Sequence, residues 1–208
     1  NFKFSRGFTL VEMLVAVSIF STVVTIAADV FIRAQRAQRH AAALEKVQDV
    51  TRFLMTRFAQ EVATGRIDYA YYTNAHITDG AIISDTLAVK SPDGQTTLFT
   101  VRGANHTDYG AVCGASEITA PCLVISLPMP APGRHERATP DGYTIQKLAF
   151  AITPDKDPLV VDPTLNDYPL DVQPKVTVMM AVRGAVPGIR EPIDLSVQTT
   201  LSSREYVR

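Results

Sequence analysis

Helix-breaking residues are missing from the first third of the chain. No proline precedes Pro92, and no glycine lies between Gly7 and Gly65. Both residues destabilise the interior of a helix, so nothing local stops a single helix from running through this segment. A helix over 8–64 would be about 86 Å long, which is too long for the core of a small domain.

An excess of charge of one sign is also missing. The 208 residues include 20 Lys and Arg against 21 Asp and Glu, which leaves a formal net charge of −1. Nucleic-acid binding needs a basic footprint, so no nucleic-acid partner is expected. The chain is 46% hydrophobic and 20% charged, as is typical of a folded protein.

Motifs for catalysis and metal binding are absent as well. The sequence contains no glycine-rich phosphate loop, no GxSxG elbow and no convincing set of nucleophile, base and acid. Its four histidines lack the spacing of metal ligands. We therefore predict no metal site, no cofactor and no catalytic residues. Calcium binding by the aspartates of the loop 154–174 is the alternative to a solvated acidic loop. We do not expect the protein to be an enzyme.

A long apolar run near the N-terminus is the most conspicuous feature that is present. Of the 21 residues from Phe8 to Ala28, 15 are apolar and one, Glu12, is charged. Roughly 20 such residues cross a bilayer as a helix, so this run predicts a membrane span. A cleaved secretory signal is the alternative, but an acidic residue near its start is atypical.

The next segment, 29–64, has the pattern of an amphipathic helix. Apolar residues recur there at spacings of three and four: Leu44, Val47, Val50, Leu54, Phe58 and Val62. Gly65 is a plausible C-cap that would end the helix.

From Gly65 onward the pattern changes to short β-rich runs. Strands are predicted at 86–90, 96–102, 122–127, 143–153, 175–183 and 193–202. The first two flank Ser91-Pro92-Asp93-Gly94, a turn sequence that predicts a hairpin. We therefore predict an α+β fold in which a long N-terminal helix packs on one antiparallel β-sheet domain, 65–208.

The two cysteines, Cys113 and Cys122, are nine residues apart and form no CxxC motif. Both follow the predicted span. In an oxidising compartment they suit a disulfide that closes a small loop, and two buried thiols are the alternative.

The residues around the start of the apolar run resemble the class III signal of type IV pilins and pseudopilins. Lys3 and Arg6 precede Gly7-Phe8-Thr9-Leu10-Val11-Glu12, and the apolar helix follows. The resemblance implies a leader peptide, 1–7, that a prepilin peptidase removes between Gly7 and Phe8 before it methylates the new amine of Phe8. It also implies a transmembrane and assembly helix, 8–28, an amphipathic helix, 29–64, and an extracytoplasmic domain, 65–208.

The same resemblance implies a single-pass protein of the inner membrane that is incorporated into a type IV pilus or a type II secretion pseudopilus. The partners implied are other pilin or pseudopilin subunits, the prepilin peptidase and the inner-membrane assembly platform. Three features are typical of minor pseudopilins of the J or W type, which lie near the filament tip. They are a span that lacks proline, a large outer domain and the terminal strand 196–204. The rival interpretation is a signal-anchored extracytoplasmic enzyme or ligand-binding module.

Glu12 is the residue of the span that most needs an explanation. A carboxylate within a span costs about 2.5 to 3.5 kcal/mol on insertion scales and usually indicates a functional partner. Cleavage would place the amine of Phe8 one helical turn before Glu12, in the same subunit or a neighbouring one. The alternative is that Glu12 lies near the lipid headgroups at the end of the span.

One count opposes this topology. Arg33, Arg36 and Arg39 follow the span and outnumber Lys3 and Arg6 before it, so the positive-inside rule would place the large domain in the cytoplasm. The peptidase signal, in contrast, requires a cytoplasmic Gly7. We give precedence to the signal.

Overall fold

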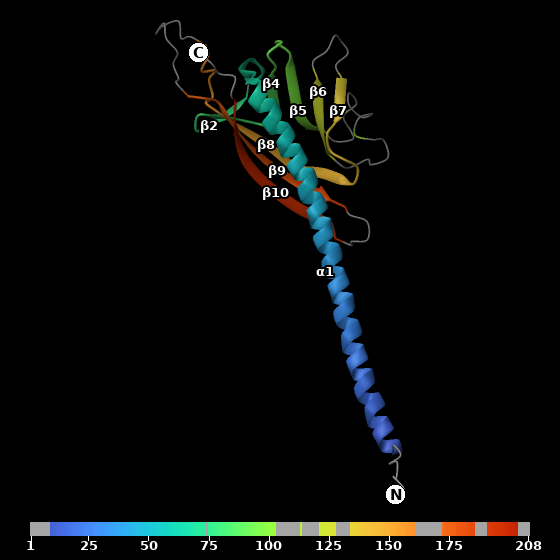
Figure 1. Ribbon diagram of the computed structural model, residues 1–208. Coiled ribbons are helices and arrows are strands. Elements are labelled where there is room, and N and C mark those ends of the chain that lie inside the picture. Colours follow the sequence, from blue (N-terminus) through green and yellow to red (C-terminus); the bar gives the residue numbers. More distant parts are fainter. Residues whose placement is uncertain are drawn as a thin grey trace. The chain divides into compact units, whose positions relative to one another are not determined.

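The computed structural model describes residues 9–73, 75–102, 113, 121–127, 134–160, 172–185 and 191–203. One helix, α1 (Leu10–Thr64), is followed by a short 3-10 helix, η1 (Tyr69–Tyr72), and by strands (Figure 1). The chain divides into two compact units, Asn1–Ala43 and Leu44–Arg208, and their boundary falls within α1. The described part of the first unit is therefore helix alone, whereas the second unit holds the last turns of α1 and all the described strands.

The strands of the second unit form two five-stranded sheets in which every neighbouring pair is antiparallel. The first sheet consists, in spatial order, of β1 (Arg66–Ile67), β4 (Thr86–Lys90), β5 (Thr96–Arg102), β6 (Cys122–Leu127) and β7 (Arg134–Arg137). The second consists of β10 (Ile193–Ser202), β9 (Lys175–Gly184), β8 (Tyr143–Thr153), β3 (Ala81–Ser84) and β2 (His76–Thr78).

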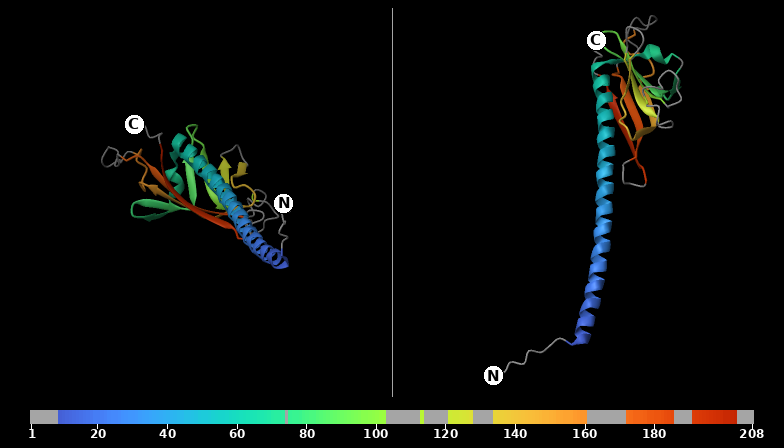
Figure 2. Two further views of the ribbon diagram at one scale, coloured as in Figure 1. Left: turned by 60° about the horizontal axis from the view of Figure 1, so that its bottom comes forward. Right: turned by 90° about the vertical axis from the view of Figure 1, so that its right-hand side faces the viewer.

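The last turns of α1 cover one side of these sheets, as the right-hand view of Figure 2 shows. Four residues of the predicted apolar stripe are fully buried, namely Val47, Leu54, Phe58 and Val62. The ring of Phe58 packs edge to face against two other rings. The distance between ring centroids is 5.3 Å to Phe99 of β5 and 5.6 Å to Phe150 of β8. One helical side chain thus joins the cores of the two sheets, and the predicted α+β fold is confirmed.

The predicted hairpin between β4 and β5 is also confirmed. The amide of Gly94 donates to the carbonyl of Ser91 at 2.9 Å, and the amide of Ser91 donates to the carbonyl of Gln95 at 2.7 Å. Gly94 has a φ of 85°, in the left-handed region that glycine adopts without strain.

Gly65 follows the helix as predicted, but for a different physical reason. Its φ is not positive, so it is not a left-handed C-cap. A Cβ at this position would lie 2.5 Å from Cγ1 of Val89 and 2.9 Å from the carbonyl oxygen of Lys90. Glycine is therefore required because the chain passes directly against β4.

The predicted disulfide is present. Cys113 and Cys122 are bridged, with their Cα atoms 6.0 Å apart. Both residues are buried, and they form a small apolar cluster with Val124 of β6. The bridge therefore ties residue 113 to the start of a buried strand.

Candidate functional site at the N-terminal end of the long helix

Glu12 takes part in a capping box at the start of α1. The amide of Glu12 donates to Oγ1 of Thr9 at 3.3 Å, while Oε2 of Glu12 accepts from the amide and the hydroxyl of Thr9, each at 3.0 Å. Such reciprocal bonds satisfy backbone amides that have no partner within the helix. The carboxylate of Glu12 therefore has a local structural partner, Thr9.

This cap was not predicted from the sequence, although the sequence carries its signature. A threonine followed three residues later by glutamate, just before an apolar run, is the signature of a capping box. Gly7 and Phe8 lie outside the described residues, so the cleavage between them, the methylation of Phe8 and the pairing of its amine with Glu12 stay predictions.

The first half of α1 presents apolar side chains that no described residue of the chain buries. Leu10, Phe20 and Phe31, for example, are 81%, 69% and 62% exposed. The helix is long and apolar enough to cross a membrane, and none of its apolar stretch is buried within the chain. Such a surface in a folded protein needs lipid or other proteins to cover it.

Three hydroxyl groups along this stretch are satisfied within the helix. Ser18 donates to the carbonyl of Leu14 at 2.8 Å, Thr22 to that of Ser18 at 2.9 Å, and Thr25 to that of Ser21 at 2.8 Å. These bonds to the preceding turn reduce the free-energy cost of placing a hydroxyl in an apolar medium. Glu12 therefore stands apart as the charged side chain of the 10–28 stretch.

An ion pair follows at the end of the apolar stretch. Oδ2 of Asp29 lies 2.9 Å from Nε of Arg33, one turn further along the helix, and both side chains are more than half exposed. Exposed pairs of this kind contribute little stability, about 0.3–0.5 kcal/mol. The pair of Asp29 and Arg33 lies where the apolar half of α1 ends and its polar half begins.

Among the residues that the structure describes, no three His, Cys, Asp or Glu side chains lie close enough together to hold a metal ion.

Comparison with known proteins points to the same segment. Residues 2–28 match the family model described as the prokaryotic N-terminal methylation motif. No curated protein and no solved structure matches the chain. The match covers the capping box and the apolar stretch of α1.

Proposed function

Because the chain carries the N-terminal methylation motif of the type IV pilin and pseudopilin family, we propose that it is a minor pilin or pseudopilin subunit. The precursor is held in the inner membrane by residues 8–28, with 65–208 on the outer side. The prepilin peptidase cuts after Gly7 and methylates the amine of Phe8. The assembly platform then extracts the subunit, which stacks through its apolar helix into a filament.

The observation that carries this proposal is that the motif, residues 2–28, runs into an uninterrupted helix whose apolar side chains are exposed. Side chains such as Leu14 and Phe20, 62% and 69% exposed, would be covered by lipid before assembly and by neighbouring helices after it. A structural subunit, rather than an enzyme, is what the motif implies.

The processing step can be tested on the N-terminal peptide of protein recovered from membranes and filaments. Mass spectrometry should find a peptide that begins at Phe8 and carries one additional methyl group. Gly7→Val should accumulate as precursor, because a branched side chain blocks the approach of the peptidase to the backbone. Ser5→Val, which adds the same kind of side chain within the leader, should be processed normally. Filament protein that retains Asn1–Gly7 would refute the proposal.

The finer part of the proposal, a position near the tip, rests on the size of the outer domain and on the lack of proline in the span. Tip subunits are needed in few copies per filament. Quantitative mass spectrometry of sheared filaments should therefore find this chain at a small fraction of the amount of the main subunit. Equal or greater abundance would assign it instead to the filament shaft.

A further inference from the structure

Strand β10 is the outermost strand of the second sheet. It pairs with β9 over its whole length, from Ile193↔Gly184 to Ser202↔Lys175, without a register shift. No other described strand pairs with its free edge. Natural proteins usually protect such an edge with charged side chains, above all lysine, or with proline, a bulge or a very short strand. The ten-residue strand β10, IDLSVQTTLS, contains no lysine, proline or bulge, and its one charged residue, Asp194, is paired with Arg183 of β9.

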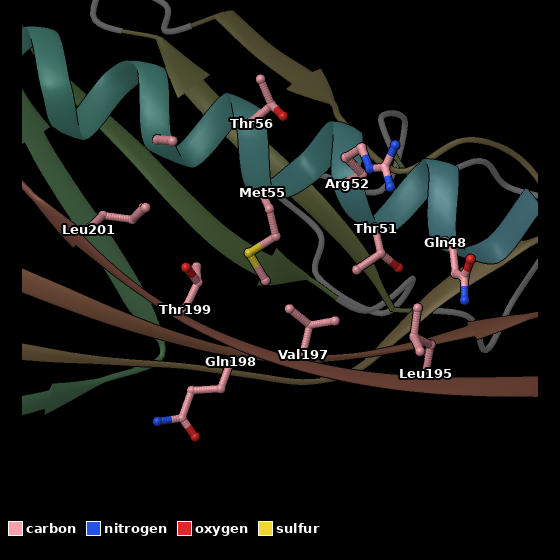
Figure 3. Close-up of a pocket in the computed structure, with 11 residues that line it drawn as sticks. Gln48, Thr51, Arg52, Met55, Thr56, Leu195, Val197, Gln198, Thr199 and Leu201 are labelled. Carbon is pink, nitrogen blue, oxygen red and sulfur yellow. The ribbon is translucent and has the colours of Figure 1, made fainter. Parts of the chain in front are cut away.

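The inward side of β10 is incompletely covered. Its residues Leu195, Val197, Thr199 and Leu201 are half-buried, whereas the residues paired with them on β9 (Val182, Met180, Val178 and Val176) are buried. A groove of about 690 Å³ lies between these β10 side chains and α1. Figure 3 shows Val197 of β10 and Met55 of α1 pointing into it from opposite sides. The open edge and the apolar groove are therefore continuous.

Arg52 is the charged residue among those that line the groove. Its side chain is exposed, and in the part of the chain that the structure describes it forms no ion pair. No carboxylate lines the groove, and Asp194 of β10 already binds Arg183 through two hydrogen bonds, at 2.7 and 2.8 Å. Among the described residues, the groove thus presents a cation without a counter-charge.

We propose that β10 is a docking edge for an extended strand of a different protein. That strand would continue the sheet through backbone hydrogen bonds, place apolar side chains at every second position into the groove, and bring a carboxylate to Arg52. A second copy of this chain fits less well, because β10 of that copy would bring no free carboxylate to Arg52. The proposal holds whether or not the chain is a filament subunit.

The test uses the full chain in detergent micelles and synthetic ten-residue peptides with a soluble ethylene-glycol tag. The peptides alternate valine with threonine, and one central valine is replaced by glutamate or by lysine. We expect saturable binding of the glutamate peptide by fluorescence anisotropy, and binding of the lysine peptide that is about threefold to tenfold weaker. This range follows from the modest strength of an exposed ion pair, counted once as attraction and once as repulsion.

Arg52→Glu should reverse the preference between the two peptides, since it reverses the charge in the groove. Lys46→Glu makes the same charge change at an exposed position of α1 that does not line the groove, and it should leave the preference unchanged. Both variants should unfold at the same temperature as the unaltered protein. Methylation of the peptide amides at the alternate residues whose N–H groups face β10 should abolish binding, because it removes the donors that pair with this edge, and methylation at the other alternate residues should leave binding intact.

Three results would overturn the proposal. The first is no saturable binding of the glutamate peptide, and the second is binding that survives amide methylation at both sets of alternate residues, each set tested in a separate peptide. The third is efficient disulfide crosslinking of Val197→Cys between two copies in native membranes, which would identify a second copy as the occupant. Failure of N-terminal processing would leave all three readouts unaffected, so the docking edge and the filament role are tested separately.

Discussion

At the scale of single residues, Glu12 has one observed role and one predicted role, which different substitutions can separate. Its carboxylate closes the capping box with Thr9, and the sequence predicts that it also pairs with the amine of Phe8 after cleavage. A neutral amide can replace the carboxylate in the first role but not in the second, because glutamine also serves in capping boxes. Glutamine and valine at this position therefore separate the two.

We predict that Glu12→Gln and Glu12→Val both insert into the membrane and are cleaved, yet both enter filaments poorly. Each leaves the ammonium of Phe8 without a counter-charge in an apolar bundle, where an unpaired charge costs about several kcal/mol. Crosslinking to partner pilins measures incorporation, and protease resistance of 65–208 measures folding. Normal incorporation of Glu12→Gln, with loss confined to Glu12→Val, would show that the cap alone matters. Protease sensitivity of 65–208 would instead reveal a wider structural role.

Gly184 is a second residue whose identity the structure explains. A Cβ at this position would lie 2.6 Å from Cγ2 of Val47 and 3.1 Å from Cε1 of Tyr143. Gly184→Ala should therefore destabilise the second unit by about 1–3 kcal/mol, the usual cost of overpacking. Val47→Ala makes room for the added methyl group, so the double variant should be more stable than the sum of the single changes. Denaturant unfolding of the four proteins measures this coupling, and simple additivity would contradict it.

At the scale of elements, Tyr72 fastens η1 to strand β4 of the first sheet. Its buried hydroxyl donates to the carbonyl of Thr86 at 3.2 Å and accepts from the amide of Ala88 at 2.7 Å. Both partners belong to β4. Burial raises the pKa of Tyr72, because an ionised phenol would lose its hydration there.

Tyr72→Phe should destabilise the protein by about 1–3 kcal/mol, since it leaves a buried amide and carbonyl without partners. Tyr71→Phe, at an exposed neighbour, is the matched control and should have little effect. The raised pKa also fixes the direction of a pH effect. The unfolded chain ionises Tyr72 above pH about 10 while the folded chain keeps it neutral, so stability is lost as the pH rises further. Tyr72→Phe should reduce that loss, and equal alkaline slopes in thermal unfolding would contradict this assignment.

The same scale shows what could be predicted from sequence. The six longer strands carry β-rich patterns over five to eleven residues, and all six were located. Strands β1, β2, β3 and β7 are two to four residues long, which is too short to show an alternation of apolar and polar residues. The groove beside β10 could not be predicted from the sequence, for another reason. It depends on which strand ends the sheet, and strand order is set by contacts between distant segments rather than by local pattern.

At the scale of the whole molecule, two features bear in opposite directions on which side of the membrane holds the second unit. The basic residues after the span, Arg33, Arg36 and Arg39, favour the cytoplasm by the positive-inside rule. The bridge between Cys113 and Cys122 favours an oxidising exterior, because thiols are kept reduced in the cytoplasm.

We therefore predict that both cysteines are bridged in the cell. Alkylation of denatured protein without prior reduction should label neither thiol, and alkylation after reduction should label both. Removal of the bridge by Cys113→Ser together with Cys122→Ser should lower stability by about 2–4 kcal/mol, as is typical of a native disulfide. Full labelling without reduction would place the second unit in the cytoplasm. It would then contradict the direction of the signal, since a cytoplasmic Gly7 and a cytoplasmic second unit cannot both flank a single span.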